Sequence, residues 1–338
     1  MIWIAVDAMG GDFAPTNVVD GALAATRHFD VGVTLVGRSQ PIEAELARYR
    51  WLDRDKVRIV EAADVVSMEE SPMAALRRKP GASIKVAADL VAAGRADALV
   101  SAGHTGATVM AAHGAFGMLA GVDRPALAAT IPTRQRPAVL LDVGASIECR
   151  PRHLLQFAVM GAVYARVGLD IESPRVGLLS IGEEATKGNE LTREAHPLLK
   201  ASPLGFVGNI EARDIYSGEA DVIVCDGFTG NVVLKSSEGL VDMIEAGLSG
   251  SFTTRVGSLL ARRTLRHVRR RVDYSEYGGA PLLGVAGVTI VGHGRSSARA
   301  VRNAVALAYR FATQHFIERV EQEIARACGR PQMSAAPR

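Results

Sequence analysis

The chain has 338 residues, of which 48% are hydrophobic, and a formal net charge of +3. This composition allows a large core in one or two domains, and so small a charge argues against a nucleic acid held by bulk charge. Cys149, Cys225 and Cys328 lack the paired spacing of a disulfide framework or a CxxC metal site, which fits a reducing cytoplasm. The first residues carry neither a basic export signal nor a long apolar span, so we expect neither export nor membrane spanning.

Short β-branched segments alternate with amphipathic segments along the chain. The predicted strands, in chain order, are 2–6, 33–36, 57–60, 98–100, 128–131, 139–141, 175–179, 222–224 and 288–291. The predicted helices are 17–28, 83–93, 107–119, 153–167, 230–246 and 298–326. Such alternation predicts an α/β fold with a mainly parallel sheet and helices on both faces.

The first predicted strand runs directly into a turn rich in glycine and carboxylates. The segment IAVDAMGGDFAP places Asp7, Gly10, Gly11 and Asp12 where the apolar run ends. Glycines permit a positive φ and let a ligand approach the backbone. Because α/β proteins bind ligands at the carboxyl ends of their strands, we predict that this turn borders the site.

A second turn of this kind follows the predicted strand at 98–100, in ALVSAGHTGATVMAA. A helix that starts near Thr105 would present N–H groups to an anion, with the hydroxyls of Ser101 and Thr105 beside them. The alternative is that Thr105 only caps the helix.

Five later segments repeat the pattern of glycine with Asp, Glu, Asn or His after an apolar strand. They lie at 140–150, 178–190, 206–215, 224–235 and 289–297. One such turn is ordinary in any α/β protein. So many of them predict loops that converge on one edge of the sheet.

Common cofactor and catalytic motifs are missing from the sequence. The GHG at 292–294 lacks the third glycine of a dinucleotide fingerprint, and there is no GxxxxGK[ST], GxSxG or HExxH. We therefore expect no nucleotide cofactor and no zinc or other metal. Cys149 and His153 have i,i+4 spacing, and a core thiol beside a surface histidine is favoured over a nucleophile–base pair.

Taken together, these segments resemble the phosphate acyltransferase family, the acyl-ACP:phosphate transacylases. The resemblance rests on DAMGGDFAP, SAGHTGA, LDVGAS, LLSIGEEATKGN, GFVGNIEARDI, DVIVCDGFTGNVVLKSSEG and DYSEYGGAPLLGVAG…VGHGRSS, in consistent order over nearly the whole chain. His104, Ser146 and Ser180 stand where asparagine is commoner in the family.

The resemblance implies an enzyme that converts long-chain acyl-ACP and inorganic phosphate into acyl phosphate and free ACP, supplying phosphatidic acid and phospholipid synthesis. It implies a Rossmann-like three-layer fold similar to phosphotransacetylases and isocitrate dehydrogenases, with no organic cofactor. It also implies a homodimer that is cytoplasmic and binds the membrane surface reversibly, with a glycerol-phosphate acyltransferase downstream. The alternatives are an NAD(P)-dependent dehydrogenase of related architecture and a non-catalytic ACP- or membrane-binding scaffold.

The implied reaction needs a dianionic phosphate held in line and donors for a tetrahedral oxyanion. Four residues are assigned to these catalytic needs: Lys187, Asn231, His104 and Asp7. For Lys187 the alternative is a solvated lysine, and for Asn231 it is a helix cap. The residues assigned to phosphate or substrate binding are Gly10, Gly11, Asp12, Ser101, Gly103, Thr105, Gly106, Asn209, Asp226, Gly230 and His293.

The segment 249–272 departs from the α/β pattern, since it has seven arginines and no acidic residue. Two apolar stripes at helical spacing predict a helical hairpin over 249–275, inserted in a single catalytic domain at 1–328, with a disordered tail at 329–338. Basic amphipathic helices bind membrane surfaces; acidic ACP, a dimer contact or a solvated face are the alternatives. The expected membrane or ACP contacts are Val256, Leu259, Leu260, Arg262, Arg263, Arg266 and Arg270.

Overall fold

The computed structural model describes residues 1–249 and 277–329. Within these ranges the strands are β1 (Ile2–Asp7), β2 (Val31–Gly37), β3 (Val57–Glu61), β4 (Ala98–Ser101), β5 (Ala126–Ile131), β6 (Ala138–Leu141), β7 (Arg175–Ser180), β8 (Gly205–Glu211), β9 (Val222–Val224), β10 (Ala280–Leu283) and β11 (Val288–Val291). They form one eleven-stranded sheet in the order β3-β2-β1-β4-β11-β10-β5-β6-β9-β7-β8. Neighbouring strands are parallel except where β10 pairs with β11 and β5, and where β5 pairs with β6.

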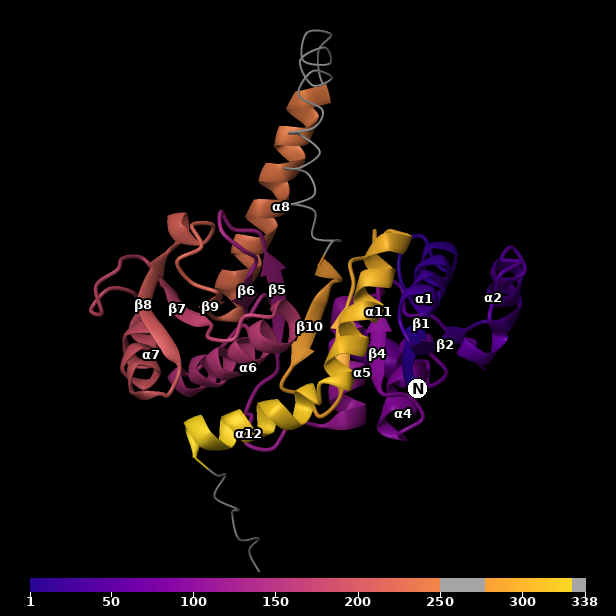
Figure 1. The fold of residues 1–338 in the computed structure, drawn as a ribbon, viewed down its shortest axis with the longest axis horizontal. Coiled ribbons are helices and arrows are strands. Elements are labelled where there is room, and N and C mark those ends of the chain that lie inside the picture. Colours follow the sequence, from indigo (N-terminus) through magenta and orange to yellow (C-terminus); the bar gives the residue numbers. More distant parts are fainter. Residues whose placement is uncertain (250–276, 330–338) are drawn as a thin grey trace, which may run out of the picture.

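Helices connect and cover these strands (Figure 1). They are α1 (Thr16–His28), α2 (Ser39–Leu46), α3 (Pro72–Arg78), α4 (Ser83–Ala92), α5 (Thr105–Phe116), α6 (Pro151–Leu169), α7 (Glu190–Ala201), α8 (Gly227–Ser249), α11 (Ala298–Thr313) and α12 (Phe316–Cys328), with short 3₁₀ turns at Arg54–Lys56 and Ala212–Asp214. Figure 1 shows α8 projecting away from the body of the molecule.

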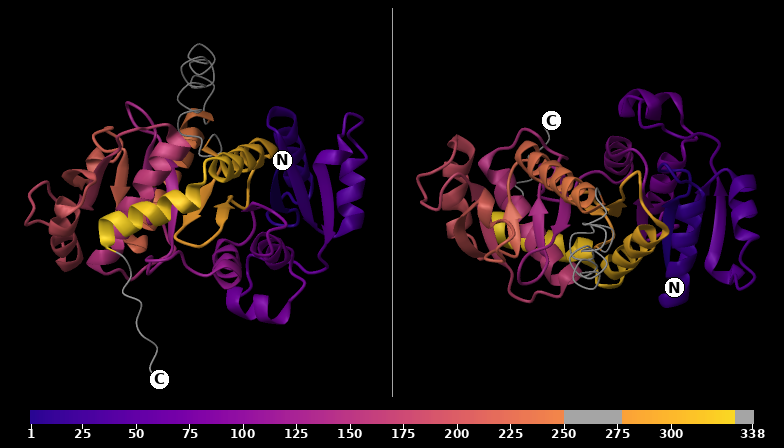
Figure 2. Two further views of the ribbon diagram at one scale, coloured as in Figure 1. Left: turned by 60° about the horizontal axis from the view of Figure 1, so that its bottom comes forward. Right: turned by 90° about the horizontal axis from the view of Figure 1, so that it is seen from above.

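Alternate residues of each strand feed cores on opposite faces of the sheet, as the period of two requires. In β1, Ile4 and Val6 pack into the core beneath α1, α6, α11 and α12, whereas Ala5 packs into the core beneath α4 and α5. Figure 2 shows α11 and α12 following one another across the same side of the sheet. The predicted α/β fold with a mainly parallel sheet and helices on both faces is therefore confirmed.

Two predicted segments are wrong. Residues 206–215, predicted as a turn, mostly form β8, whose alternating exposure is that of an edge strand and whose glycines disguise it. The helix predicted over 298–326 is two helices, α11 and α12, because His315 adopts a left-handed conformation with a φ of 52°. This turn stacks Phe316 on Phe311, with ring centroids 4.1 Å apart, and sends α12 across α6.

The other boundaries shift by a few residues, and β10, α2, α3 and α7 were not predicted. All described strands belong to one sheet, which is compatible with a single domain over 1–328. The domain assignment itself stays a prediction. The predicted hairpin at 249–275 and the tail beyond residue 329 lie outside the described residues.

A buried carboxylate ties the amino ends of the strands in the second half of the sheet. Asp221 is 1% exposed in its side chain and accepts hydrogen bonds from Arg136 Nε at 2.9 Å and Arg175 Nε at 3.0 Å. Burial by itself would raise the pKa of Asp221, but the hydrogen bonds from Arg175 and Arg136 lower it from 3.8 to about 2. The stability that this shift contributes is present above pH 3.8 and is lost as the pH falls towards 2.

Asp221→Asn is therefore expected to lower the free energy of unfolding by about 2 kcal/mol at pH 7, since charged hydrogen bonds are lost. Urea unfolding between pH 5 and pH 2.5 should show a shallower loss of stability for this variant than for the parent. Asp30→Asn is the control, because Asp30 is 74% exposed and pairs loosely with Lys56. Parallel pH profiles for parent and Asp221→Asn would contradict the prediction.

Candidate active site

Strand register brings the ends of β1, β4 and β11 into one line. Asp7 and Val291 each lie opposite Ser101 in parallel pairing. The loops that follow bond to one another: Gly292 N–H donates to Ser101 O at 2.7 Å, and the loop after β1 bonds to Gly294 O. These three loops form the first cluster of the site.

The buried carboxylate of Asp7 orients the loops of this cluster through hydrogen bonds. Its Oδ2 accepts the Ser101 hydroxyl at 2.8 Å, and Ser101 Oγ in turn accepts the Gly103 N–H at 3.1 Å. A Cβ on Gly10 would lie 2.6 Å from Asp7 Oδ2 and 2.8 Å from Gly103 N, so only glycine allows this approach. Burial raises the pKa of Asp7, against hydrogen bonds from Ser83 and Ser101. Asp7 thus orients the loop after β4 and is itself 3% exposed.

A second buried carboxylate, Asp142, follows β6 and organises a second cluster. Its two oxygens accept four backbone N–H groups, from Leu127, Gly144, Ala145 and Ser146, at 2.5–3.1 Å. Burial raises the pKa of Asp142, while these N–H groups lower it. No role was predicted for Asp142 from the sequence, although it directly follows β6, much as Asp7 ends β1.

The start of α8 packs directly on the Asp142 loop. Ideal Cβ atoms on Gly227 and Gly230 would lie 2.6 Å from Asp142 Oδ2 and 1.9 Å from Asp142 O. Asp226 caps the helix, since its carboxylate accepts the N–H and the hydroxyl of Thr229 at 2.9 and 2.7 Å. The cap is therefore Asp226, and the alternative that Asn231 caps α8 is wrong.

Gly230→Ala is expected to push α8 away from the Asp142 loop and to lower the free energy of unfolding by about 2 kcal/mol or more, the cost of overpacking. Gly239→Ala in the same helix is the matched control, because a Cβ there meets nothing within 4 Å. It should raise stability by up to about 1 kcal/mol. Thermal unfolding of both variants measures the difference, and equal effects would contradict this packing argument.

A hollow of about 300 Å³, open to solvent, lies between the two clusters. Its floor comes from the sheet and is mostly apolar: Leu127, Ala129, Thr130, Ala280 and Val291. Its polar lining comes from loops, the start of α5 and the first half of α8: Thr105, Gly144, Asn231, Lys235, Glu238, Gly292 and His293. Val143, Leu234, Tyr277 and Gly279 complete the lining. The side chain of Asn231 lies against Gly144, across from the first turn of α5.

Of the predicted site residues, Thr105, Asn231 and His293 line this hollow. The others of the first cluster are Asp7, Gly10, Gly11, Asp12, Ser101, Gly103, His104 and Gly106, and those of the second are Asp226 and Gly230. Lys187 and Asn209 are not among the residues lining it. Lys187 is exposed in the loop after β7, and Asn209 Nδ2 supports that loop by donating to Gly182 O and Glu184 O at 3.2 and 2.8 Å.

His104 sits at the entrance to α5. Its Nδ1 accepts the Ala107 N–H at 3.4 Å, so His104 is the cap and Thr105 is the first helical residue. The alternative that Thr105 only caps this helix is therefore wrong. The remaining N–H groups of the first turn of α5 lie beside the hollow, where an anion would be favoured.

Cys149 and His153 do not form a nucleophile–base pair. The Cys149 thiol donates to Ser146 O, and His153 Nδ1 accepts the Arg150 N–H at the start of α6. Burial and the nearby Asp142 raise the pKa of Cys149 to about 12, which keeps the thiol protonated. The expected core thiol beside a surface histidine is wrong in detail, because His153 is buried in α6 and Cys149 is only partly buried.

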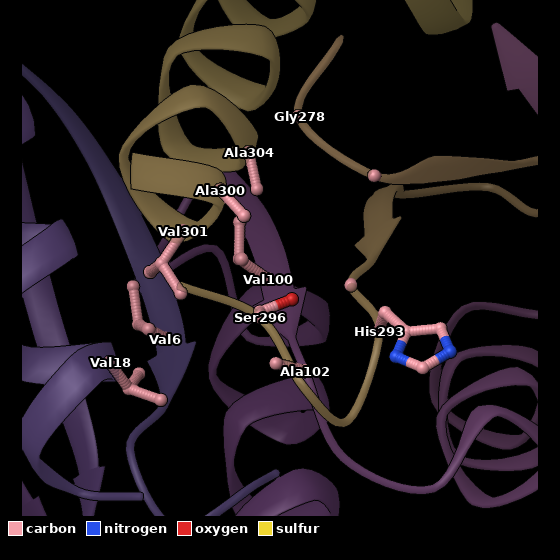
Figure 3. Close-up of a pocket in the computed structure, with 12 residues that line it drawn as sticks. Val6, Val18, Val100, Ala102, Gly278, His293, Ser296, Ala300, Val301 and Ala304 are labelled. Atoms are coloured by element: carbon pink, nitrogen blue, oxygen red, sulfur yellow. The ribbon is translucent and has the colours of Figure 1, made fainter. Parts of the chain in front are cut away.

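A small apolar cavity of about 10 Å³ lies behind the loop that carries His293 (Figure 3). Val6, Val100 and Val301 line it, and Figure 3 shows the His293 ring turned away from them. Gly279, Gly292 and His293 line both this cavity and the hollow, so the loop separates core packing from the site. Within 1–249 and 277–329 no group of three or more His, Cys, Asp or Glu side chains is arranged to hold a metal ion.

The fold is similar to that of solved phosphotransacylases. A phosphotransacetylase from Streptococcus pyogenes matches with a TM-score of 0.65 and 18% identity, over 93% of this chain and 94% of the other. A branched-chain phosphotransacylase from Enterococcus faecalis matches with a TM-score of 0.58 and 15% identity, over 92% and 99%. Together with the loops gathered at the carboxyl ends of the strands, this likeness defines an α/β protein with the phosphotransacetylase fold.

Proteins related in sequence identify the family within this fold class. A phosphate acyltransferase from Heliobacterium modesticaldum is 51% identical over 325 residues, 95% of this chain and 97% of the relative. One from Desulforudis audaxviator is 52% identical over 309 residues, 90% of this chain and 91% of the relative. The family model described as "Fatty acid synthesis protein" matches residues 2–319. The chain belongs to this family of phosphate acyltransferases, and it is an acyltransferase enzyme of fatty acid and lipid synthesis.

Proposed function

We propose that the enzyme transfers a long-chain acyl group from acyl-ACP to inorganic phosphate, and that the acyl phosphate supplies phosphatidic acid synthesis through a glycerol-phosphate acyltransferase downstream. The observation that supports this proposal best is the make-up of the hollow. Its apolar sheet floor suits an alkyl chain, and its rim of helix N–H groups, amide and ammonium suits phosphate.

In this mechanism phosphate binds at the rim, near the first turn of α5 and Asn231. A phosphate oxygen attacks the thioester carbonyl and forms the new C–O bond. The tetrahedral oxyanion takes hydrogen bonds from donors at the rim, the C–S bond breaks, and the thiolate of the carrier leaves. A thiol with a pKa of about 8.5 needs little acid assistance to leave, so the site has little need of a general acid.

Incubation of the enzyme with long-chain acyl-ACP and phosphate, followed by trapping with hydroxylamine, tests this function. We expect a hydroxamate that depends on phosphate and a matching release of free ACP. A parallel arm with acyl-CoA measures the preference for the carrier. No hydroxamate above the phosphate-free control with either donor would overturn the proposal.

Lys187 is proposed as an additional phosphate ligand, and Asn209 as the residue that positions its loop through the hydrogen bonds to Gly182 and Glu184. An exposed lysine in a loop can reach a substrate without lining the apo hollow. A phosphate dependence unchanged in Lys187→Ala would remove this assignment.

We also propose that a cytoplasmic homodimer binds anionic membranes or ACP through the basic segment 249–272. The support is its composition, seven arginines and no acidic residue. No helix in the described part of the chain has the length and low polarity needed to cross a membrane. Flotation with anionic vesicles at low and high salt is the test, and no binding at either salt concentration would end the membrane proposal.

A further inference from the structure

Two charged residues that line the hollow, Lys235 and Glu238, have no predicted role from the sequence. Lys235 and Glu238 follow Asn231 on α8 at i+4 and i+7, so all three lie on one face of the helix, and all three line the hollow. Lys235 Nζ lies 2.8 Å from Glu238 Oε2, and the side chains are 55% and 31% exposed.

We infer that Lys235 is a phosphate-binding residue of this hollow, and that Glu238 holds its ammonium group until phosphate displaces the carboxylate. This inference rests on the proposed function for the identity of the phosphate acceptor. It assigns the cation of the site to α8, next to Asn231, in addition to the loop after β7.

The charge of the hollow supports this role. Among the lining residues that the structure describes, Lys235 is the one side chain with a permanent positive charge, and Glu238 is the one carboxylate. The charges of Lys235 and Glu238 cancel each other, whereas phosphate brings up to two negative charges into the hollow. A phosphate dianion bound at the rim therefore attracts the Lys235 ammonium group more strongly than the singly charged Glu238 carboxylate does.

The geometry of the pair argues against a purely structural role. A lysine that precedes its glutamate on a helix has the less favourable order for helix support. An exposed pair also contributes little to stability and exchanges partners readily. Lys235 can thus leave Glu238 for phosphate without cost to the fold.

Phosphate dependence of turnover in three variants tests the inference. Lys235→Met is expected to raise the KM for phosphate about tenfold, as one charge-assisted hydrogen bond is lost, with the KM for the acyl donor little changed. Glu238→Gln should lower the KM for phosphate, because its competitor is gone, and Lys235→Arg should stay near the parent. Lys85→Met is the matched control, since Lys85 forms an exposed ion pair with Asp89 on α4.

Opposite shifts in the KM for phosphate support the role, whereas a structural pair predicts that Lys235→Met and Glu238→Gln change it alike. A second measurement needs no turnover: stabilisation against heat by inorganic phosphate should shrink in Lys235→Met and persist in Lys85→Met. Equal stabilisation of Lys235→Met and parent would overturn the inference. If phosphate binding depends on Lys235 but the parent makes no acyl phosphate, the proposed reaction fails and the phosphate site stands.

Discussion

Replacing Asp142 by alanine is expected to lower the free energy of unfolding by about 4 kcal/mol or more, the largest stability effect that we predict for one residue. The carboxylate is fully buried and accepts N–H groups from Leu127, Gly144, Ala145 and Ser146. The bonds from Leu127 and Ser146 are buried and those from Gly144 and Ala145 are part-buried. Each buried N–H left without a partner costs about 1–3 kcal/mol, and the two part-buried groups add to this loss.

Urea unfolding measures this loss, and Asp142→Asn separates its causes. The amide keeps the shape and one acceptor oxygen, but it turns an NH₂ group towards a backbone N–H, so an intermediate loss is expected. Asp30→Ala is the control for removing an exposed carboxylate. A loss below about 1 kcal/mol for Asp142→Ala would show that the N–H groups find other partners.

Asn231→Ala is expected to lower kcat/KM about 100-fold, the loss that follows removal of one donor to a developing oxyanion. Asn231 is exposed on the rim and lies against Gly144, and Asp226 provides the helix cap. Its removal should therefore leave the free energy of unfolding within about 0.5 kcal/mol of the parent. The expected result is an enzyme that folds normally and turns over slowly.

Asn231→Asp distinguishes an anion ligand from a packing residue. The carboxylate has nearly the shape of the amide but repels phosphate, so Asn231→Asp should be less active than Asn231→Ala. Val232→Ala is the control on α8, because Val232 is exposed and does not line the hollow. Steady-state rates at varied phosphate measure all three variants, and full activity in Asn231→Asp would rule out a role in binding the anion.

Local patterns in the sequence were enough for the architecture. Strand segments such as 222–224 and 288–291 and the helix at 17–28 are found where predicted, within a residue or two, because period and propensity are local properties. The glycine-rich turns also follow strands, as predicted, at Gly10, Gly103 and Gly292. The break at His315 and the edge strand β8 escaped prediction because packing against other segments decides both.

Contacts between distant segments determine which residues line the site. Lys187 and Lys235 are both lysines near glycine-rich turns, and the sequence favoured Lys187, yet Lys235 is the one that lines the hollow with Asn231. Pairing of β10 with β5 and β11 determines this arrangement, since it sets the two loop clusters on either side of one floor. The sequence by itself therefore determined the fold class and the loop chemistry through local preferences. Only the tertiary structure decided which loops share a hollow, because strand order is set by burial and pairing between residues far apart in the chain.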